Sequence, residues 1–303
     1  MRWMIRGGCT YVCLASWFIY YLLIPAAFAH SNWIGFALAC SIAPFIGVWA
    51  IYLMHECWHR YFEDIDNRKM FLLFCALLFT QPGAYGHGHR THHKHVNTYE
   101  DLEIHPVGRI ASRGGRIIFY VGSSLFGSIF LLLLGLGQSG TDDSKESRWN
   151  KVMPLVWLGT WGMIGTAAWA ITQATLTDIL IAYAISIWAT SFAHRHNEMI
   201  EHGGVIAEGS LAFRANQTRS LKPDSLLARY FLLITHDDSR EHTLHHTQPE
   251  RNWRLQEEHA RACSDWRPRV SLTEYFQITL RLMAGQEPTV IKESTLKGRG
   301  NGL

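Results

Sequence analysis

Charged residues are scarce in this chain, and their scarcity excludes some classes of protein. Asp, Glu, Lys and Arg account for 17% of the 303 residues, and the formal net charge is only +3. No basic stripe with interleaved aromatic residues is present, so the sequence predicts no nucleic-acid binding. The six cysteines are scattered rather than grouped, which favours reduced packing residues over a disulfide framework.

The chain also lacks the motifs with which proteins carry their own electrons. It contains no His-Pro-Gly-Gly haem motif, no glycine-rich nucleotide-binding pattern and no cysteine cluster for an iron–sulfur centre. A reaction that consumes electrons would therefore need an external donor.

Long apolar runs are what the sequence has instead. A helix needs about 20 apolar residues to cross a bilayer. The apolar run at 70–80 is too short to cross and is interpreted as a re-entrant or interfacial helix. The run at 116–137 is also interpreted as re-entrant or interfacial, because an even number of crossings keeps the histidine motifs described below on one side of the membrane. The sequence thus predicts an all-α integral membrane fold with about four transmembrane helices in two hairpins, interfacial or re-entrant helices and a histidine-rich cap. The predicted spans are residues 11–29, 33–54, 152–171 and 176–192.

Charge placement predicts the orientation of these spans. Arg2 and Arg6 precede the first run, so the positive-inside rule places the N-terminus and the histidine motifs in the cytoplasm. The compact form, with no fused donor domain, favours a bacterial inner membrane. We expect one membrane-bound domain over residues 1–280 and a polar, disordered tail over residues 281–303.

Histidine is the abundant residue, with 17 copies. Eight of them fall into three groups, which we call the 55 pair (His55, His59), the 89 triplet (His89, His92, His93) and the 242 triplet (His242, His245, His246). Positions i, i+3 and i+4 share one face of a helix, so each group can direct its imidazoles at one place. Neutral imidazole suits transition metals. Eight histidines exceed the four ligands of a tetrahedral zinc site, so two metal ions fit the count, with His202 as the candidate ninth ligand.

In order and spacing, the three groups resemble the histidine motifs of the membrane-bound fatty acid desaturase family. The similarity covers roughly residues 30–255. It implies a non-haem centre of two iron ions held by histidines, with O₂ as co-substrate, four spanning helices and a cytoplasmic cap. Further matching residues are Arg90, Asn97, Asp101-Leu102-Glu103, Glu201-His202-Gly203 and Pro249.

The third motif departs from the family pattern. It continues as His-His-Thr-Gln-Pro and follows an acidic approach at Asp237-Asp238 and Glu241, which leaves the subtype open. It is also similar to the third motif of alkane mono-oxygenases. Hydroxylation of a lipid, alkane or carotenoid-like substrate therefore stays open beside desaturation.

The chemistry implied by the resemblance sets further expectations. An unactivated methylene has no usable acidity, so metal-activated oxygen rather than a side-chain base must remove its hydrogen. Carboxylates near the histidines are expected to accept the outer ring N–H groups: Glu56, Glu201, Asp238 and Glu241. Basic residues are expected either to bind the head group of a lipid- or carrier-linked acyl substrate or to attract anionic lipid: Arg109, Arg113, Arg116, Arg214 and Arg219.

Electrons are expected from a ferredoxin- or cytochrome-b5-like protein. Its expected docking site is a basic face formed by Arg251, Arg254, Arg261, Arg267 and Arg269. Two other readings use the same histidines. His55-Glu56-Cys57-Trp58-His59 matches the H-E-x-x-H motif of zinc metalloproteases, with Glu56 as general base, but this leaves both triplets without a purpose. A histidine-rich metal transporter would place its ligands within the spanning helices rather than beside them.

Overall fold

The computed structural model describes residues 7–29, 32–130, 147–236, 242–247, 249 and 269–297. The chain forms two compact units. We call the first the membrane unit (Met1–Gly86, Gly137–Ala193, Ile234–His236) and the second the histidine-rich unit (His87–Leu136, His194–Leu233, Asp237–Leu303). The prediction of a single domain over residues 1–280 stays a prediction.

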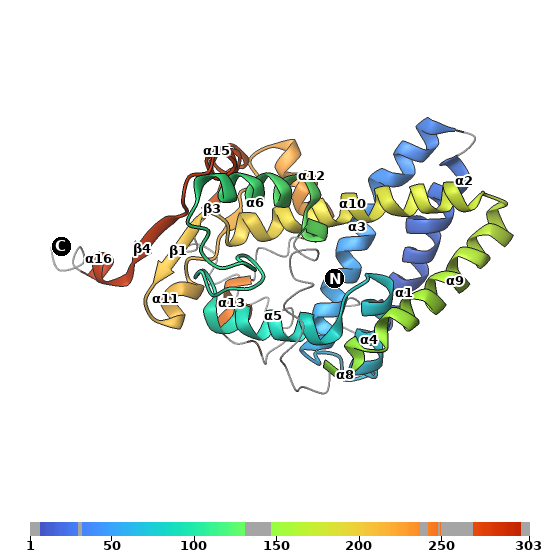
Figure 1. Cartoon of the computed structure of the whole chain (residues 1–303), viewed down its shortest axis with the longest axis horizontal. Coiled ribbons are helices and arrows are strands. Elements are labelled where there is room, and N and C mark those ends of the chain that lie inside the picture. Colours follow the sequence, from blue (N-terminus) through green and yellow to red (C-terminus); the bar gives the residue numbers. More distant parts are fainter. Residues whose placement is uncertain are drawn as a thin grey trace. The chain divides into compact units, whose positions relative to one another are not determined.

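Four helical stretches among the described residues are long and apolar enough to cross a membrane, which confirms the predicted all-α membrane fold (Figure 1). The first combines α1 (Gly8–Ser16), the π-helix η2 (Trp17–Leu23) and α2 (Ile24–Ala29). The others are α3 (Trp33–Trp58), α9 (Met153–Thr172) and α10 (Leu176–Glu201). On α9, Leu155, Leu158 and Met163 are 72%, 74% and 70% exposed, as expected of side chains that face lipid.

Local signals explain where these helices begin and turn. The Asn32 side chain caps α3 by accepting the N–H of Gly35 at 3.0 Å. Between α9 and α10, Gln173 adopts a left-handed conformation with φ of 55°. The next helix is then capped where Asp178 accepts the backbone N–H of Thr175 at 3.0 Å. This short connection produces the second predicted hairpin.

The membrane unit also contains α4 (Asn67–Leu77) and α8 (Ser147–Asn150). Its main core joins α1, η2, α3, α4 and α9 around fully buried residues such as Phe74 and Trp17. At Gly47 of α3, a Cβ atom would collide with Thr190 of α10, so glycine lets these two helices approach closely. With 11 residues, α4 is too short to span, as its sequence predicted.

The histidine-rich unit surrounds the last turns of α10. Its hydrophobic core includes Phe119 and Tyr120 of α6 and Tyr275 and Leu282 of α15. Two parallel strand pairs complete it, β1 with β4 and β2 with β3. Its elements are the end of α5 (Pro82–His95), α6 (Arg113–Phe126), β1 (Val205–Glu208), α11 (Leu211–Ala215), β2 (Ser220–Leu221), α12 (Leu226–Ile234), α13 (His242–Thr247), β3 (Arg269–Val270), α15 (Leu272–Met283), β4 (Thr289–Lys292) and α16 (Glu293–Lys297).

The run at 116–137 does not form a spanning helix in its described part. Helix α6 has 14 residues and ends at Gly127, whose φ of 62° suits glycine. A helix of that length rises about 21 Å, less than the roughly 30 Å hydrocarbon core. Residues 131–137 lie outside the described residues.

The expectation of a disordered tail from residue 281 is wrong for residues 281–297. Arg281–Met283 complete α15, and β4 pairs with β1 in the register Val205↔Thr289 to Glu208↔Lys292. The short Thr289-Val290-Ile291 run is β-branched, which favours a strand, but its partner strand lies more than 80 residues earlier in the sequence. Composition alone could not reveal that pairing.

Candidate metal centre

The 89 triplet lies on the buried side of α5. Pro82 starts this helix, where its missing N–H costs nothing. His89 and His92 are 3% and 2% exposed, whereas Arg90 and Lys94 on the other side are exposed. The helix therefore separates a histidine face from a basic face, as the spacing predicted.

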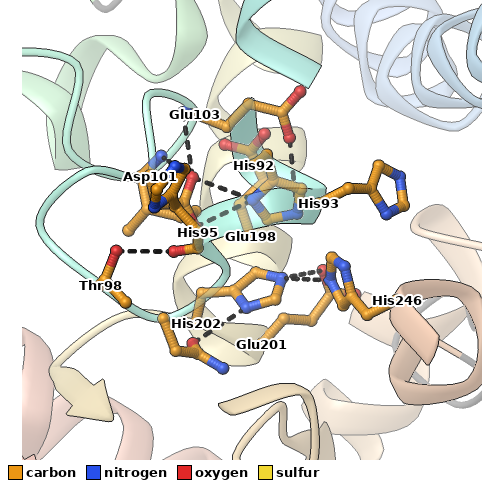
Figure 2. A network of polar contacts seen from close by, with 12 residues as sticks. His92, His93, His95, Thr98, Asp101, Glu103, Glu198, Glu201, His202 and His246 are labelled. Atoms are coloured by element: carbon orange, nitrogen blue, oxygen red, sulfur yellow. Dashed lines mark hydrogen bonds and ion pairs between the residues drawn. The ribbon is translucent and has the colours of Figure 1, made fainter. Parts of the chain in front are cut away.

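Four histidines from three segments of the histidine-rich unit form what we call cluster A: His92, His202, His242 and His246. One ring nitrogen of each lies within 4.8 Å of those of the other three. The Nε2 atoms of His202 and His246 are 3.4 Å apart, and the rings of His92 and His246 have centroids 4.6 Å apart. Figure 2 shows His92, His202 and His246 in this arrangement.

Three further histidines of the same unit form cluster B: His89, His93 and His245. The Nε2 atoms of His89 and His93 are 3.0 Å apart, and the ring centroids of His93 and His245 are 4.6 Å apart. His245 is 1% exposed. The structure thus brings together the two triplets and His202, seven of the nine predicted ligands.

The 55 pair lies in the membrane unit, at the C-terminal end of α3. Its two ring centroids are 4.7 Å apart, as i and i+4 spacing predicts. Glu56 is 3% exposed, and its carboxylate oxygen lies 3.8 Å from His55 Nδ1. Its expected role of holding the ring of His55 stays a prediction.

Polar partners fix the orientation of three ligand rings. Asp101 is fully buried, and each of its carboxylate oxygens lies 2.9 Å from Nδ1 of His92. Glu103 Oε1 lies 2.8 Å from Nδ1 of His89. With N–H groups at Nδ1, both rings present an Nε2 lone pair for a metal. Figure 2 shows Asp101 and Glu103 near His92 and His93.

Asn97 does the same for His202. Its Oδ1 lies 3.1 Å from His202 Nδ1, and its Nδ2 donates to the carbonyl of Arg214 at 2.8 Å. Asn97 adopts a left-handed backbone with φ of 58°, which asparagine tolerates better than most residues. Asn97, Asp101 and Glu103 were known from the sequence only as family resemblance, and their ring-holding role was missed. Their signal was their place just after the 89 triplet.

Glu201 lies beside cluster A. Its Oε2 is 3.6 Å from His242 Nε2, and its Oε1 accepts an N–H of Asn197 at 2.8 Å. Asp238 and Glu241, the other expected carboxylates, lie outside the described residues, as do Arg251, Arg254, Arg261 and Arg267 of the expected donor site.

The electrostatics of His202 and His246 in cluster A fit a transition-metal ion. Burial holds the pKa of His202 and His246 well below the usual histidine range, so both rings are neutral, the form that binds metals. Burial would also lower the pKa of His92, but the charges of Asp101 and Glu103 raise it to about 10. Among the described residues the buried Nδ1 of His246 has no hydrogen-bond partner. A buried polar atom of that kind fits a metal ligand.

The expected head-group arginines are mostly engaged within the protein. Arg219 is 9% exposed and donates to the carbonyls of Met199 and Gly203, which gives it a structural role, and its expected role in binding a head group stays a prediction. Its burial lowers its pKa to about 10. Arg116 donates to the carbonyls of Gly285 and Ile110, which gives it a structural role as well.

The remaining three arginines lie nearer the surface. Arg109 pairs with Glu287 at 3.0 Å, and Arg113 and Arg214 donate to the carbonyls of Ala284 and Lys94. For these three the head-group role stays a prediction.

Comparison with known proteins agrees with this geometry. The Fatty acid desaturase family matches residues 31–276, more than half of the chain, and this range includes the 55 pair, both triplets and His202. No curated protein and no solved structure matches the chain. With its spanning helices and clustered histidines, the chain belongs to the fatty acid desaturase family, a family of membrane oxidoreductases.

Proposed function

We propose that this protein is a non-haem di-iron desaturase that uses O₂ to introduce a double bond into a fatty acyl chain. The observation that carries the proposal is the pair of imidazole clusters whose rings are oriented by Asp101, Glu103 and Asn97. An all-imidazole donor set suits iron among the transition metals. Membership of the fatty acid desaturase family supports iron and an acyl substrate over the alternatives.

The 55 pair is assigned to cluster B in this proposal. Cluster A has four histidines, whereas cluster B has three within the histidine-rich unit. His55 and His59 offer two more imidazoles at a spacing suited to a single ion. With them the two iron ions share nine histidines. A single zinc of the metalloprotease type would need only the 55 pair and one more ligand, and would leave cluster A unexplained.

Bound iron would supply the oxidising chemistry that an unactivated methylene requires. The side chains of the protein position the histidine rings and exclude water from their ligand atoms. Asp101 and Glu103 hold His92 and His89 with Nε2 towards the clusters, and Asn97 holds His202. Burial of His202, His245 and His246 to 2% exposure or less keeps bulk water from the ligand atoms.

The substrate would be an acyl chain of a lipid or of a carrier-linked fatty acid. The apolar spans support this, because they place the enzyme where such chains are concentrated. We further propose a bacterial inner membrane with the metal centre on the cytoplasmic side, on the strength of Arg2 and Arg6 before the first span. Electrons would come from a ferredoxin- or cytochrome-b5-like protein.

The test combines metal analysis with product mass. The protein is purified in detergent, its metals are quantified, and lipids of an expressing host are compared by mass spectrometry with those of a host carrying His92→Ala/His93→Ala. We expect two irons per chain and acyl chains that have lost two hydrogens, both absent from the variant. A single zinc per chain would refute the proposal. Acyl chains that gain one oxygen would show that the reaction is hydroxylation and not desaturation.

A further inference from the structure

Arg195, on the part of α10 that belongs to the histidine-rich unit, is a fully buried arginine. Its Nη1 donates to the carbonyl of Glu103 at 3.3 Å and to Oε2 of Glu198 at 3.2 Å. Its Nη2 donates to the carbonyl of Ile104 at 3.2 Å. The guanidinium therefore connects α10 to the turn that follows α5.

The two carbonyls that Arg195 binds belong to residues whose N–H groups are also held by a charged side chain. Oδ1 of Asp101 accepts the N–H groups of Glu103 and Ile104 at 3.1 and 3.3 Å. Among the described residues no backbone N–H donates to either carbonyl. One buried carboxylate and one buried guanidinium thus hold all four polar backbone groups of Glu103 and Ile104, in a turn that is neither helix nor strand.

This turn carries the carboxylates that orient one ring in each cluster. Glu103 Oε1 lies 2.8 Å from Nδ1 of His89 in cluster B. Both carboxylate oxygens of Asp101 lie 2.9 Å from Nδ1 of His92 in cluster A. A side chain can hold a ring only as firmly as its own backbone is held, and ligand positions need a precision of about 0.5 Å. Arg195 fixes the backbone behind these carboxylates.

Stability alone does not explain an arginine at this position. A buried guanidinium is costly unless its donors are paired, and apolar side chains of similar volume often serve stability as well. The buried Nε of Arg195 has no hydrogen-bond partner among the described residues, so this pairing is incomplete. What arginine offers is a rigid fork that reaches three acceptors at once, which the point charge of lysine does not.

Glu198 holds the fork of Arg195 from the other side. It belongs to the same polar network as Asp101 and Glu103 (Figure 2), and its side chain is 18% exposed. It supplies the counter-charge that a buried guanidinium requires. Because Glu198 lies three residues after Arg195 on α10, both groups are fixed to the helix that ends beside His202 of cluster A.

We propose that Arg195 is a positioning residue of the metal centre. It fixes the turn that carries Asp101 and Glu103 and, through these carboxylates, the rings of His92 and His89. The described hydrogen bonds of Arg195 go to this turn and to Glu198, so it acts through other residues. The inference rests on the proposed function, because ring orientation matters only if the rings bind metal.

The test compares Arg195→Met and Arg195→Lys in the detergent-solubilised full chain. Co(II) is the probe, because its affinity can be measured against a chelator and its visible absorption reports the geometry of its ligands. Arg195→Met should lower the affinity about tenfold and alter the absorption, as loss of a ligand's partner does. Arg195→Lys keeps the charge without the fork and should restore part of the loss, leaving about a threefold deficit.

Arg116 provides a matched control. It is an arginine of the same unit that donates to the carbonyls of Gly285 and Ile110. Among the described residues, neither Gly285 nor Ile110 contacts a histidine of the two clusters. Arg116→Met should therefore lower the melting temperature and leave the affinity and absorption of Co(II) at their wild-type values.

A double-mutant cycle tests whether Arg195 acts through Glu103. If it does, Glu103→Gln should cost little further affinity in the Arg195→Met protein, and the combined loss should be smaller than the product of the two single losses. A combined loss equal to that product would contradict action through Glu103.

Hydrogen exchange tests the same placement in the metal-free protein. Loss of the guanidinium should let the turn open more often, so Arg195→Met should speed amide exchange of peptides that cover residues 97–105 by about tenfold. Arg116→Met should leave the exchange of these peptides unchanged.

The outcomes separate the two proposals. A wild-type protein that binds no transition metal contradicts the proposed function, and this inference with it. If the wild type binds Co(II) but both Arg195 variants match its affinity and absorption, the positioning proposal alone is overturned. Equal losses of affinity in Arg195→Met and Arg116→Met would overturn it too, because Arg195 would then only stabilise the fold. If Arg195→Met does not fold, the comparison of Arg195→Lys with the wild type decides in the same way.

Discussion

Replacing Asp101 by asparagine tests whether the carboxylate beside His92 raises the metal affinity of cluster A. The carboxylate is fully buried, contacts His92 Nδ1 at 2.9 Å through both oxygens and accepts the N–H groups of Glu103 and Ile104 at 3.1 and 3.3 Å. Asparagine keeps the volume and one oxygen, so the turn after α5 should persist. It removes the charge that makes His92 a strong ligand. Loss of such a partner lowers metal affinity about 10- to 100-fold, or about 1.4 to 2.8 kcal/mol.

The pH dependence of this effect has a definite sign. In the metal-free protein, burial lowers the pKa of His92, but the charges of Asp101 and Glu103 raise it to about 10. A metal ion must displace that proton, so the wild-type affinity should rise with pH up to about pH 10. Asp101→Asn lowers the pKa of His92 and should flatten this slope. The affinity gap between wild type and variant should therefore widen as the pH increases.

The assay is equilibration with Fe(II) against a competing chelator at several pH values, followed by metal analysis. Glu103→Gln should have a smaller effect, because Glu103 retains 23% side-chain exposure and water can replace part of its contact. Glu208→Gln is the control, since Glu208 forms an exposed ion pair with Lys292 at 3.0 Å, outside the clusters. Thermal unfolding in detergent checks that each variant is folded. Equal affinity of wild type and Asp101→Asn at every pH would refute the reasoning.

Three further perturbations follow from the structure. Asn97→Gly keeps the left-handed backbone but removes the acceptor of His202, so iron affinity should fall about tenfold. The melting temperature should fall as well, because the buried bond from Asn97 to the carbonyl of Arg214 is lost. Gly47→Ala should destabilise the protein by about 1–3 kcal/mol, and adding Thr190→Ala should recover part of the melting temperature. Burial lowers the pKa of His105 from 6.5 to about 4, so the neutral ring favours the fold. Stability should be complete above pH 6.5 and fall towards pH 4, by at most about 3 kcal/mol, and His105→Gln should remove this loss in pH-dependent melting.

The spanning helices could be predicted from the sequence because hydropathy is local. The runs at 33–54 and 176–192 correspond to α3 and α10. Their ends could not be predicted, since α10 continues through polar residues to Glu201, where the histidine-rich unit buries residues such as Arg195 completely. A hydropathy profile predicts a loop for the polar end of α10, whereas burial of these residues by the rest of the unit keeps the segment helical.

The grouping of the histidines could be predicted from their spacing, but the residues that orient their rings could not. Spacing on a helix specifies which imidazoles share a face, and the two triplets were found together. The residues that hold the rings follow from the path of the chain after α5. That path returns Asp101 and Glu103 to His92 and His89 of the helix they have just left, and it brings Asn97 to His202 after α10. These contacts depend on the geometry of the turn after α5, which the spacing of residues along the sequence does not reveal.

The H-x-x-H-H spacing itself has a physical explanation in the way each triplet is divided. In α5, the i and i+4 residues His89 and His93 lie in cluster B, and the i+3 residue His92 lies in cluster A. In α13 the division is reversed, because His242 and His246 lie in cluster A and His245 lies in cluster B. Successive helical residues are about 100° apart, so His92 and His93, or His245 and His246, diverge enough to reach different ions.

Each triplet is therefore divided between cluster A and cluster B, a division that the proposed pair of ions explains and a single ion does not. An H-x-x-x-H pair, such as the 55 pair, supplies one ion only. The presence of two divided triplets and one simple pair thus favours two ions held at a fixed separation by two helices. Converting the 89 triplet to a simple pair with His92→Gln should empty cluster A and leave metal in cluster B. A variant with half the wild-type iron would support that division, whereas loss of both ions would show that the two clusters bind metal only together.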